Sequence, residues 1–86
     1  MNIAVYDTYV RKKDGQIMHF DILVPYELNN TEIIYKYGME YLASKGQQGQ
    51  VISSRECRFC HVDKATEKIK FEILEKGYYI VEMEGC

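Results

Sequence analysis

Two neighbouring stretches near the start of the chain alternate between hydrophobic and polar residues. Residues 3–10 and 16–24 are both rich in β-branched and aromatic side chains, and the pair Asp14-Gly15 lies between them. An Asp-Gly pair flanked by two such stretches is a strong hairpin signal. The sequence therefore predicts a β-hairpin with its turn at Asp14 and Gly15.

A two-residue turn would also fix which residues of the hairpin face each other. The expected pairs are Val10 with His19, Thr8 with Asp21 and Tyr6 with Leu23. One face then carries a mostly apolar set, which is the expected core side: Ile3, Val5, Asp7, Tyr9, Met18, Phe20, Ile22 and Val24. The opposite face carries Ala4, Tyr6, Thr8, Val10, His19, Asp21 and Leu23.

The segment after Pro25 has helical spacing. Asn29 supplies an N-cap, with Asn30 or Thr31 as alternatives, and Gly46 supplies a stop. The inward stripe of this helix is Ile33, Ile34, Tyr37, Tyr41 and Leu42.

The second half of the chain predicts a strand, a helix and a strand. The third strand runs from Val51 into the cysteine-rich segment, Asp63 caps the second helix, and Gly77 ends it. Its inward residues are Ala65, Ile69 and Ile73, flanked by Phe71 or Leu74. Residues 78–84 form the last strand.

This order of elements predicts an α+β fold in a single domain, residues 1–86. We expect a mixed four-stranded sheet with the chain order β-β-α-β-α-β and both helices packed on one face. The other face is then uncovered, and the chain has eight tyrosines, several of which would lie there. Burial of this face against a second copy, giving a homodimer, is one interpretation; tyrosine hydroxyls in contact with water are the other.

Charge and hydropathy narrow the class of protein. A net charge of -2 and a pI near 5.6 argue against a nucleic-acid binder, which usually carries a basic stripe. The start of the chain lacks a secretory signal pattern, and no apolar window is long enough to span a bilayer. We therefore expect a cytoplasmic protein without a membrane partner.

The densest chemistry lies in the segment from Cys57 to His61, which has the spacing Cys-x-x-Cys-His. Four ligands in a tetrahedron make a structural zinc site, and Cys57, Cys60, His61 and Cys86 are the predicted set, with His19 as a substitute. In a regular strand Cys57 and Cys60 point to opposite faces. The zinc hypothesis therefore requires a bulge at Arg58-Phe59.

Three other interpretations of the same segment stay open. Covalent haem attachment also uses Cys-x-x-Cys-His, but it requires export to an oxidising compartment. A thiol-redox pair, Cys57 with Cys60, usually lies at a helix start, and here the pair precedes the second helix by a few residues. In the third interpretation the cysteines are small buried side chains and His61 is a surface or capping residue.

A second group of polar residues lies on the hairpin. Tyr6, Thr8, His19 and Asp21 share one predicted face, where they could bind a small polar ligand or support proton transfer. A Thr8–Asp21 hydrogen bond explains part of the group without a function. Asp7 interrupts the apolar face, and a buried carboxylate needs donors or a shifted pKa, which makes it a further site candidate.

Several stretches together resemble a small bacterial family of about this length, a domain of unknown function. They are residues 4–10, the turn 13–15, residues 18–22, the segment 57–61 and the ending from Gly77 to Cys86. The resemblance implies a bacterial, single-domain α+β protein with no assigned activity. We expect a non-catalytic, self-associating module with a Cys/His zinc cluster. The alternative is a thiol-redox protein or thiol-dependent enzyme that uses Cys57 and Cys60.

Overall fold

A computed structural model describes residues 1–86 and contains four strands and two helices. They are β1 (Asn2–Arg11), β2 (Ile17–Pro25), α1 (Thr31–Ser44), β3 (Cys57–Lys64), α2 (Glu67–Lys76) and β4 (Tyr79–Glu84). The predicted α+β fold and the order β-β-α-β-α-β are confirmed. The third strand is shorter than predicted, because residues 51–56 form no strand and β3 begins only at Cys57.

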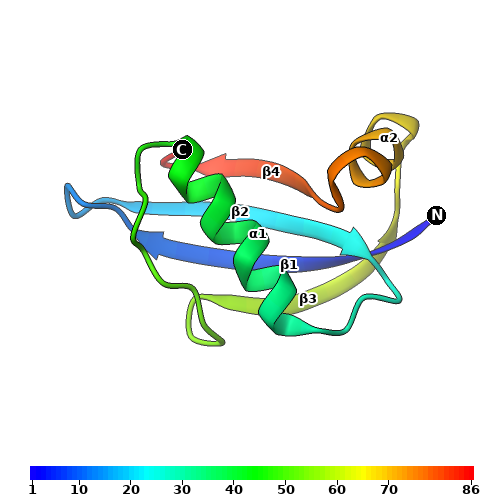
Figure 1. Cartoon of the computed structure of the whole chain (residues 1–86), viewed down its shortest axis with the longest axis horizontal. Coiled ribbons are helices and arrows are strands. Elements are labelled where there is room, and N and C mark those ends of the chain that lie inside the picture. The colour runs from blue at the N-terminus through cyan, green and yellow to red at the C-terminus, as the bar shows by residue number, and fades with distance from the viewer.

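The four strands form one open sheet in the order β3-β1-β2-β4. Every neighbouring pair is antiparallel, so the prediction of a mixed sheet is wrong. The reason lies in α2, which carries the chain from β3 at one edge to β4 at the opposite edge (Figure 1). Strands 3 and 4 therefore never become parallel neighbours.

The hairpin between β1 and β2 closes with three residues and not two. The Lys12 N–H donates to the Gln16 carbonyl at 2.7 Å, and Gly15 has a φ of 91°. A turn followed by a left-handed glycine is the common three-residue hairpin loop. The predicted register is therefore wrong by one residue, and Asp7 pairs with Asp21 while Tyr9 pairs with His19.

This shift changes which side chains share a face of the sheet. The face beneath α1 carries Ala4, Tyr6, Thr8, Val10, Met18, Phe20, Ile22 and Val24. The opposite face, here called the open face, carries Ile3, Val5, Asp7, Tyr9, His19, Asp21 and Leu23. Each strand alternates as expected, but the two strands combine differently from the prediction.

The two helices pack on opposite faces, so the prediction of both on one face is wrong. Helix α1 crosses the sheet diagonally (Figure 1), and its Ile34 and Leu42 join the core around Phe20. Helix α2 places Ile73 against Ile3, Val5 and Leu23 at one end of the open face. The remainder of that face has no helix over it.

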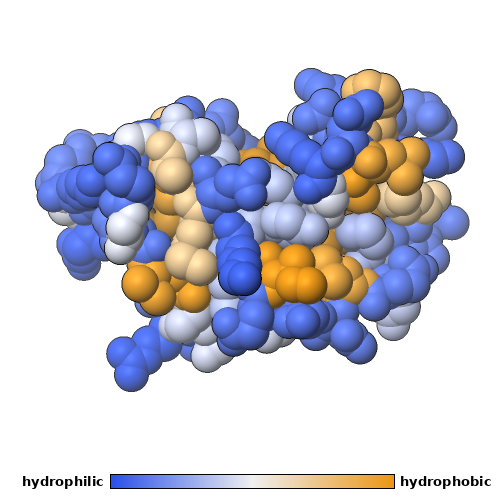
Figure 2. Space-filling view, viewed as in Figure 1, coloured by the Kyte–Doolittle hydropathy of each residue, from blue (hydrophilic) through white to orange (hydrophobic).

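Both helices begin at side-chain caps. Asn30 accepts a hydrogen bond from the Glu32 N–H, and Thr66 accepts one from the Ile69 N–H. Asp63, the predicted cap of the second helix, lies inside β3 instead. Hydrophobic surface over α2 is visible in Figure 2, and both residues predicted to flank its inward stripe, Phe71 and Leu74, are exposed. Neither α1 nor α2 is long and apolar enough to cross a membrane.

Candidate functional site

A histidine and two aspartates converge on the uncovered part of the open face. The His19 Nε2 atom lies 3.6 Å from Asp7 Oδ1 and 3.8 Å from Asp21 Oδ1. One potential ligand atom from each residue lies within 4.8 Å of both others. The two central strands, β1 and β2, hold all three, so the cluster stands on the most constrained part of the sheet. We call it the Asp-His-Asp cluster.

The backbone brings the two carboxylates unusually close. Asp7 and Asp21 are directly opposite, and the Lys12–Gln16 and Tyr26–Asn2 hydrogen bonds make theirs a non-hydrogen-bonded pair. In such pairs the Cα atoms are only about 4.5 Å apart. Like charges directly opposite each other destabilise a sheet. The pair therefore carries an electrostatic cost that a cation would offset.

The polar atoms at the centre of the cluster also lack partners. While both carboxylates are ionised, the Nε2 atom of His19 and the Oδ1 atom of Asp21 are buried and have no hydrogen-bond partner. Buried polar groups in native proteins are nearly always hydrogen-bonded, and an exception calls for an explanation. Both atoms belong to the Asp-His-Asp cluster, so one bound ion would satisfy both of them.

The pKa values of the two aspartates shift in opposite directions. Burial, together with the negative charge of the adjacent Asp7, raises the pKa of Asp21 to about 6. When Asp21 is protonated, its hydrogen bond to Asp7 lowers the pKa of Asp7. At pH 5 the pair therefore holds one proton, on Asp21, and this proton must leave before both carboxylates can bind a cation.

An aromatic neighbour orients the imidazole. The rings of Tyr9 and His19 stack with their centroids 4.1 Å apart and their planes 10° from parallel. The two residues are cross-strand partners in the hairpin, so the same register that pairs the aspartates also produces the stack. The stack restricts the His19 ring and keeps its Nε2 directed at the carboxylates.

A β-bulge in β3 places two more polar groups on the open face. Tyr6 pairs with Phe59 and Val5 with His61, which leaves Cys60 as the extra residue. The Cys60 Sγ atom lies 3.2 Å from His61 Nδ1, and Cys60 is close enough to Asp7 for the two groups to affect each other's pKa. Burial and the nearby charge of Asp7 raise the pKa of the Cys60 thiol.

Of the predicted zinc set, the structure brings only Cys60 and His61 together. Cys57 pairs with Thr8 beneath α1 and is 2% exposed, whereas Cys60 is exposed on the other face. The Cys86 thiol donates to the His19 carbonyl at 3.4 Å at the end of the chain. The bulge required at Arg58-Phe59 exists one step later, and there it aligns Cys60 with His61 and not with Cys57.

The predicted polar surface on the hairpin is also divided between the two faces. His19 and Asp21 lie on the open face, but Thr8 is fully buried and Tyr6 is partly buried on the side of α1. The residue that joins His19 and Asp21 on the open face is Asp7, which the sequence analysis noted only as an interruption of an apolar face. The signal that would have found this group is Gly15, because a left-handed glycine after a type I turn implies a three-residue loop.

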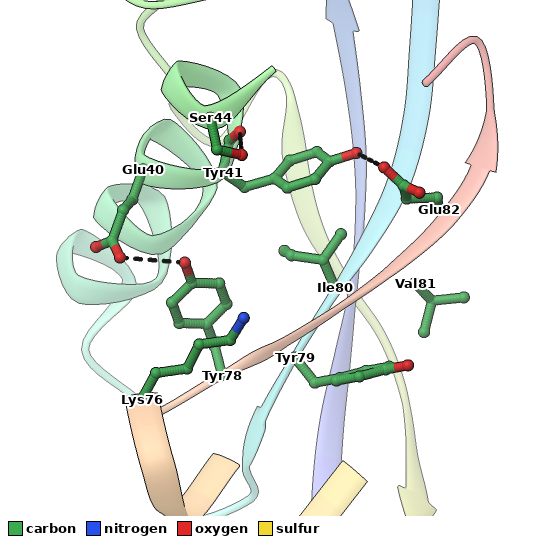
Figure 3. A pocket seen from close by; sticks show the side chains of 9 residues that line it. All are labelled: Glu40, Tyr41, Ser44, Lys76, Tyr78, Tyr79, Ile80, Val81 and Glu82. Carbon is green, nitrogen blue, oxygen red and sulfur yellow. Dashed lines mark hydrogen bonds between the residues drawn. The ribbon is translucent and has the colours of Figure 1, made fainter. Parts of the chain in front are cut away.

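A separate pocket of about 600 Å³ lies between α1, β4 and the end of α2 (Figure 3). In it the Tyr41 hydroxyl donates to Glu82, and the Tyr78 hydroxyl donates to Glu40 at 3.2 Å. Burial, together with the charge of Glu40, raises the pKa of Tyr78 to about 12. These side chains satisfy one another's hydrogen-bonding groups, so the polar residues of the pocket hold α1 against β4 and the residue that precedes it.

Comparison with known proteins identifies the family. A family model described as a domain of unknown function (DUF2024) matches residues 1–83. The chain belongs to the DUF2024 family. The NMR structure of protein NE1680 from Nitrosomonas europaea is 42% identical to this DUF2024 chain, with a TM-score of 0.86. The match covers 100% of this chain and 99% of that one. No curated protein matches.

The three thiols of this DUF2024 protein should react at different rates. We expect Cys60 and Cys86 to react with an aromatic disulfide reagent in the folded protein, because both are exposed, and Cys57 to react only when the protein unfolds. The raised pKa of Cys60 should make its reaction slower than that of an unperturbed exposed thiol. Mass spectrometry of the labelled native protein checks this. The Cys57→Ser variant serves as the control and should keep the reactions of Cys60 and Cys86 at unchanged rates. Rapid formation of a Cys57–Cys60 disulfide in the folded protein would contradict the placement on opposite faces.

Proposed function

We propose that this protein is a small metal-binding module that holds a divalent transition metal, zinc in the first instance, at the Asp-His-Asp cluster. One observation carries the proposal: three ligand atoms from Asp7, His19 and Asp21 converge, and two of them are buried without a hydrogen-bond partner when both carboxylates are ionised. Fixed strands hold the three residues, so the protein need not reorganise its backbone to bind an ion.

The spacing of the ligand atoms supports zinc. In a tetrahedral site with bonds of about 2.0 to 2.2 Å, neighbouring ligand atoms lie about 3.3 to 3.6 Å apart. The distances of 3.6 and 3.8 Å from His19 to the two carboxylates are close to this range. A small rotation of the carboxylates would complete the geometry.

The ligand types favour a transition metal over calcium or magnesium. Calcium takes six to eight oxygen ligands, and magnesium keeps several waters around one or two carboxylates. Imidazole is a ligand for zinc, copper, iron and nickel, and its presence between two carboxylates shifts the preference toward these ions. Three protein ligands also leave a fourth position for water or a small ligand.

Zinc titration of the tag-free protein tests the proposal. The measurement uses the Cys60→Ser background, so that the exposed thiol beside Asp7 does not contribute. We expect one zinc per chain, and we expect His19→Ala in that background to weaken binding at least about 100-fold, since even loss of a supporting residue costs 10- to 100-fold. Binding should also weaken below pH 6, where Asp21 holds its proton.

The matched control is Asp14→Asn in the same background. This change removes one carboxylate from the exposed hairpin turn, and asparagine can still accept the hydrogen bond from the Gln16 N–H. Zinc affinity should stay unchanged. If the His19→Ala variant binds zinc as tightly as its parent, and circular dichroism shows that both proteins are folded, the Asp-His-Asp cluster is not the zinc site.

A further inference from the structure

We propose that two copies of this chain pair through the outer edge of β3, and that Cys60 and His61 of both copies form a second zinc site at the two-fold axis. This inference does not depend on the Asp-His-Asp cluster. It places the second copy at the edge of the sheet, whereas the sequence suggested contact through the open face. Each copy supplies two ligands, so the site is complete only in the dimer.

Strand β3 has the properties of an edge that can pair. It is the end strand of the sheet, and it exposes two large hydrophobic side chains, Phe59 at 53% and Val62 at 46%. An exposed edge strand presents unpaired backbone groups, and apolar side chains on it favour pairing with another strand. The most readily available partner of the same shape is the same strand of a second copy.

The bulge makes the side-chain pattern of β3 symmetric about the bond between Cys60 and His61. Because Cys60 is the extra residue, Cys60 and His61 both lie on the open face, while Phe59 and Val62 both lie on the side of α1. If two copies of β3 pair antiparallel about this point, each residue lies opposite a residue whose side chain is on the same face of the sheet. The opposed residues would be Cys57 with Lys64, Arg58 with Asp63, Phe59 with Val62 and Cys60 with His61.

The backbone obeys the same symmetry. The Tyr9 N–H donates to the Glu56 carbonyl, and the Ala65 N–H donates to the Met1 carbonyl. In an antiparallel ladder, residues alternate between bonding the neighbouring strand and facing away from it. Counting from these two bonds, four residues of β3 direct their backbone N–H and C=O groups away from β1: Cys57, Phe59, Val62 and Lys64. Only the register centred between Cys60 and His61 places all four of these residues opposite one another.

Side-chain chemistry supports the same register. Arg58 of one copy faces Asp63 of the other, twice by symmetry, and the Phe59–Val62 pairs bury the exposed apolar side chains. The edge strand β4 offers no comparable match. Its outward backbone groups belong to Ile80 and Glu82, and pairing centred on Glu82 would place that glutamate opposite its own copy.

This register gathers four soft ligands at the axis. Within one chain Cys60 Sγ and His61 Nδ1 are already 3.2 Å apart, a separation suited to two neighbouring ligands of one zinc. The second copy brings its own pair directly across from them on the same face. Two thiolates and two imidazoles form a common tetrahedral zinc site.

Sedimentation velocity of the full chain under reducing conditions, with and without zinc, tests the proposal. We expect a zinc-dependent dimer that binds three zinc ions: one at each Asp-His-Asp cluster and one at the axis. The Cys60→Ser variant should lose the axial zinc, bind two ions per two chains and dimerise at least tenfold more weakly. If the Asp-His-Asp proposal alone fails, the wild type will bind one zinc per dimer and His19→Ala will change nothing.

Charge reversal provides the matched control for the interface. Arg58→Asp or Asp63→Arg alone would place like charges opposite each other twice, and each should raise the dimer dissociation constant at least tenfold. The double variant carrying both changes should return it to within about threefold of the wild type. A monomer at every zinc concentration, zinc stoichiometry unaffected by Cys60→Ser, or no recovery in the double variant would overturn the proposal.

Discussion

Replacing Asp21 with asparagine is expected to stabilise the metal-free protein at neutral pH while weakening the zinc binding proposed for the Asp-His-Asp cluster. Asparagine keeps the shape of the side chain but removes one of two opposed negative charges, and its amide can donate to Asp7. The opposite signs are informative, because a purely structural carboxylate would lower stability when replaced. A gain in stability with a loss of binding is the usual signature of a site maintained for its ligand.

The sign follows from the titration of Asp21. Its pKa rises from 3.8 to about 6 on folding, so the folded state holds the proton more tightly than the unfolded state. This contribution to stability is complete below pH 4 and is lost as the pH rises through 6. The lowered pKa of Asp7 acts in the opposite direction and offsets part of the loss.

The expected gain from Asp21→Asn at pH 7.5 is about 1 to 2 kcal/mol in the free energy of unfolding. A shift of about two pKa units corresponds to about 3 kcal/mol, and partial solvent screening together with Asp7 reduces it. Urea unfolding with a chelator present, at pH 4.5 and pH 7.5, measures this. The difference between variant and wild type should shrink at the lower pH.

The exposed turn variant Asp14→Asn again serves as the control, because it changes the net charge equally at a distance from the cluster. Its unfolding free energy should stay within about 0.5 kcal/mol of the wild type at both pH values. Destabilisation by Asp21→Asn at pH 7.5 would show that the Asp21 carboxylate stabilises the fold, and would contradict the expectation that its charge destabilises the metal-free protein.

Replacing Gly38 with valine is expected to destabilise the protein by about 1 to 3 kcal/mol. At Gly38, α1 packs closely against Ile22 of β2 and against Ile52 of the connection to β3. A Cβ atom there would meet the Ile52 side chain at 2.5 Å and the Ile22 side chain at 2.9 Å. Overpacking would push α1 away from the core around Phe20, and thermal unfolding should move down by about 4 to 8 °C per kcal/mol.

The matched control for this change is Ala43→Val in the same helix. Ala43 is exposed, so valine there adds the β-branch without entering the core. We expect a loss of only a few tenths of a kcal/mol from helix propensity. Equal losses for the two variants would show that Gly38 is not required by the close approach of α1 to β2.

The sequence was sufficient to predict each helix and strand, but not how the strands pair or which face each helix covers. Alternation along β1 and β2 and the helical stripes identified each element, because each signal is local. The register of the hairpin depends on a single residue in its loop, and a two-residue interpretation of Asp14-Gly15 exchanged the partners of every residue in β2. His19 and Asp21 were therefore grouped with Tyr6 and Thr8, and Asp7 was left by itself.

The arrangement of the strands could not be predicted for a different physical reason. Nothing local distinguishes a helix that returns the chain to a neighbouring strand from one that carries it to the far edge. The choice depends on which face each helix covers, and Ile73 of α2 finds its apolar partners, Ile3, Val5 and Leu23, on the face opposite α1. The bulge at Cys60 was equally invisible, since no glycine or proline marks it.

The three-residue hairpin loop has a consequence for how this protein can change over evolutionary time. Surface turns usually tolerate insertions and deletions, but loss of a single codon here would rotate β2 by half a turn relative to β1. Phe20 and Ile22 would then point to solvent, and an imidazole and a carboxylate would enter the core beneath α1. The tip can therefore vary in composition far more freely than in length.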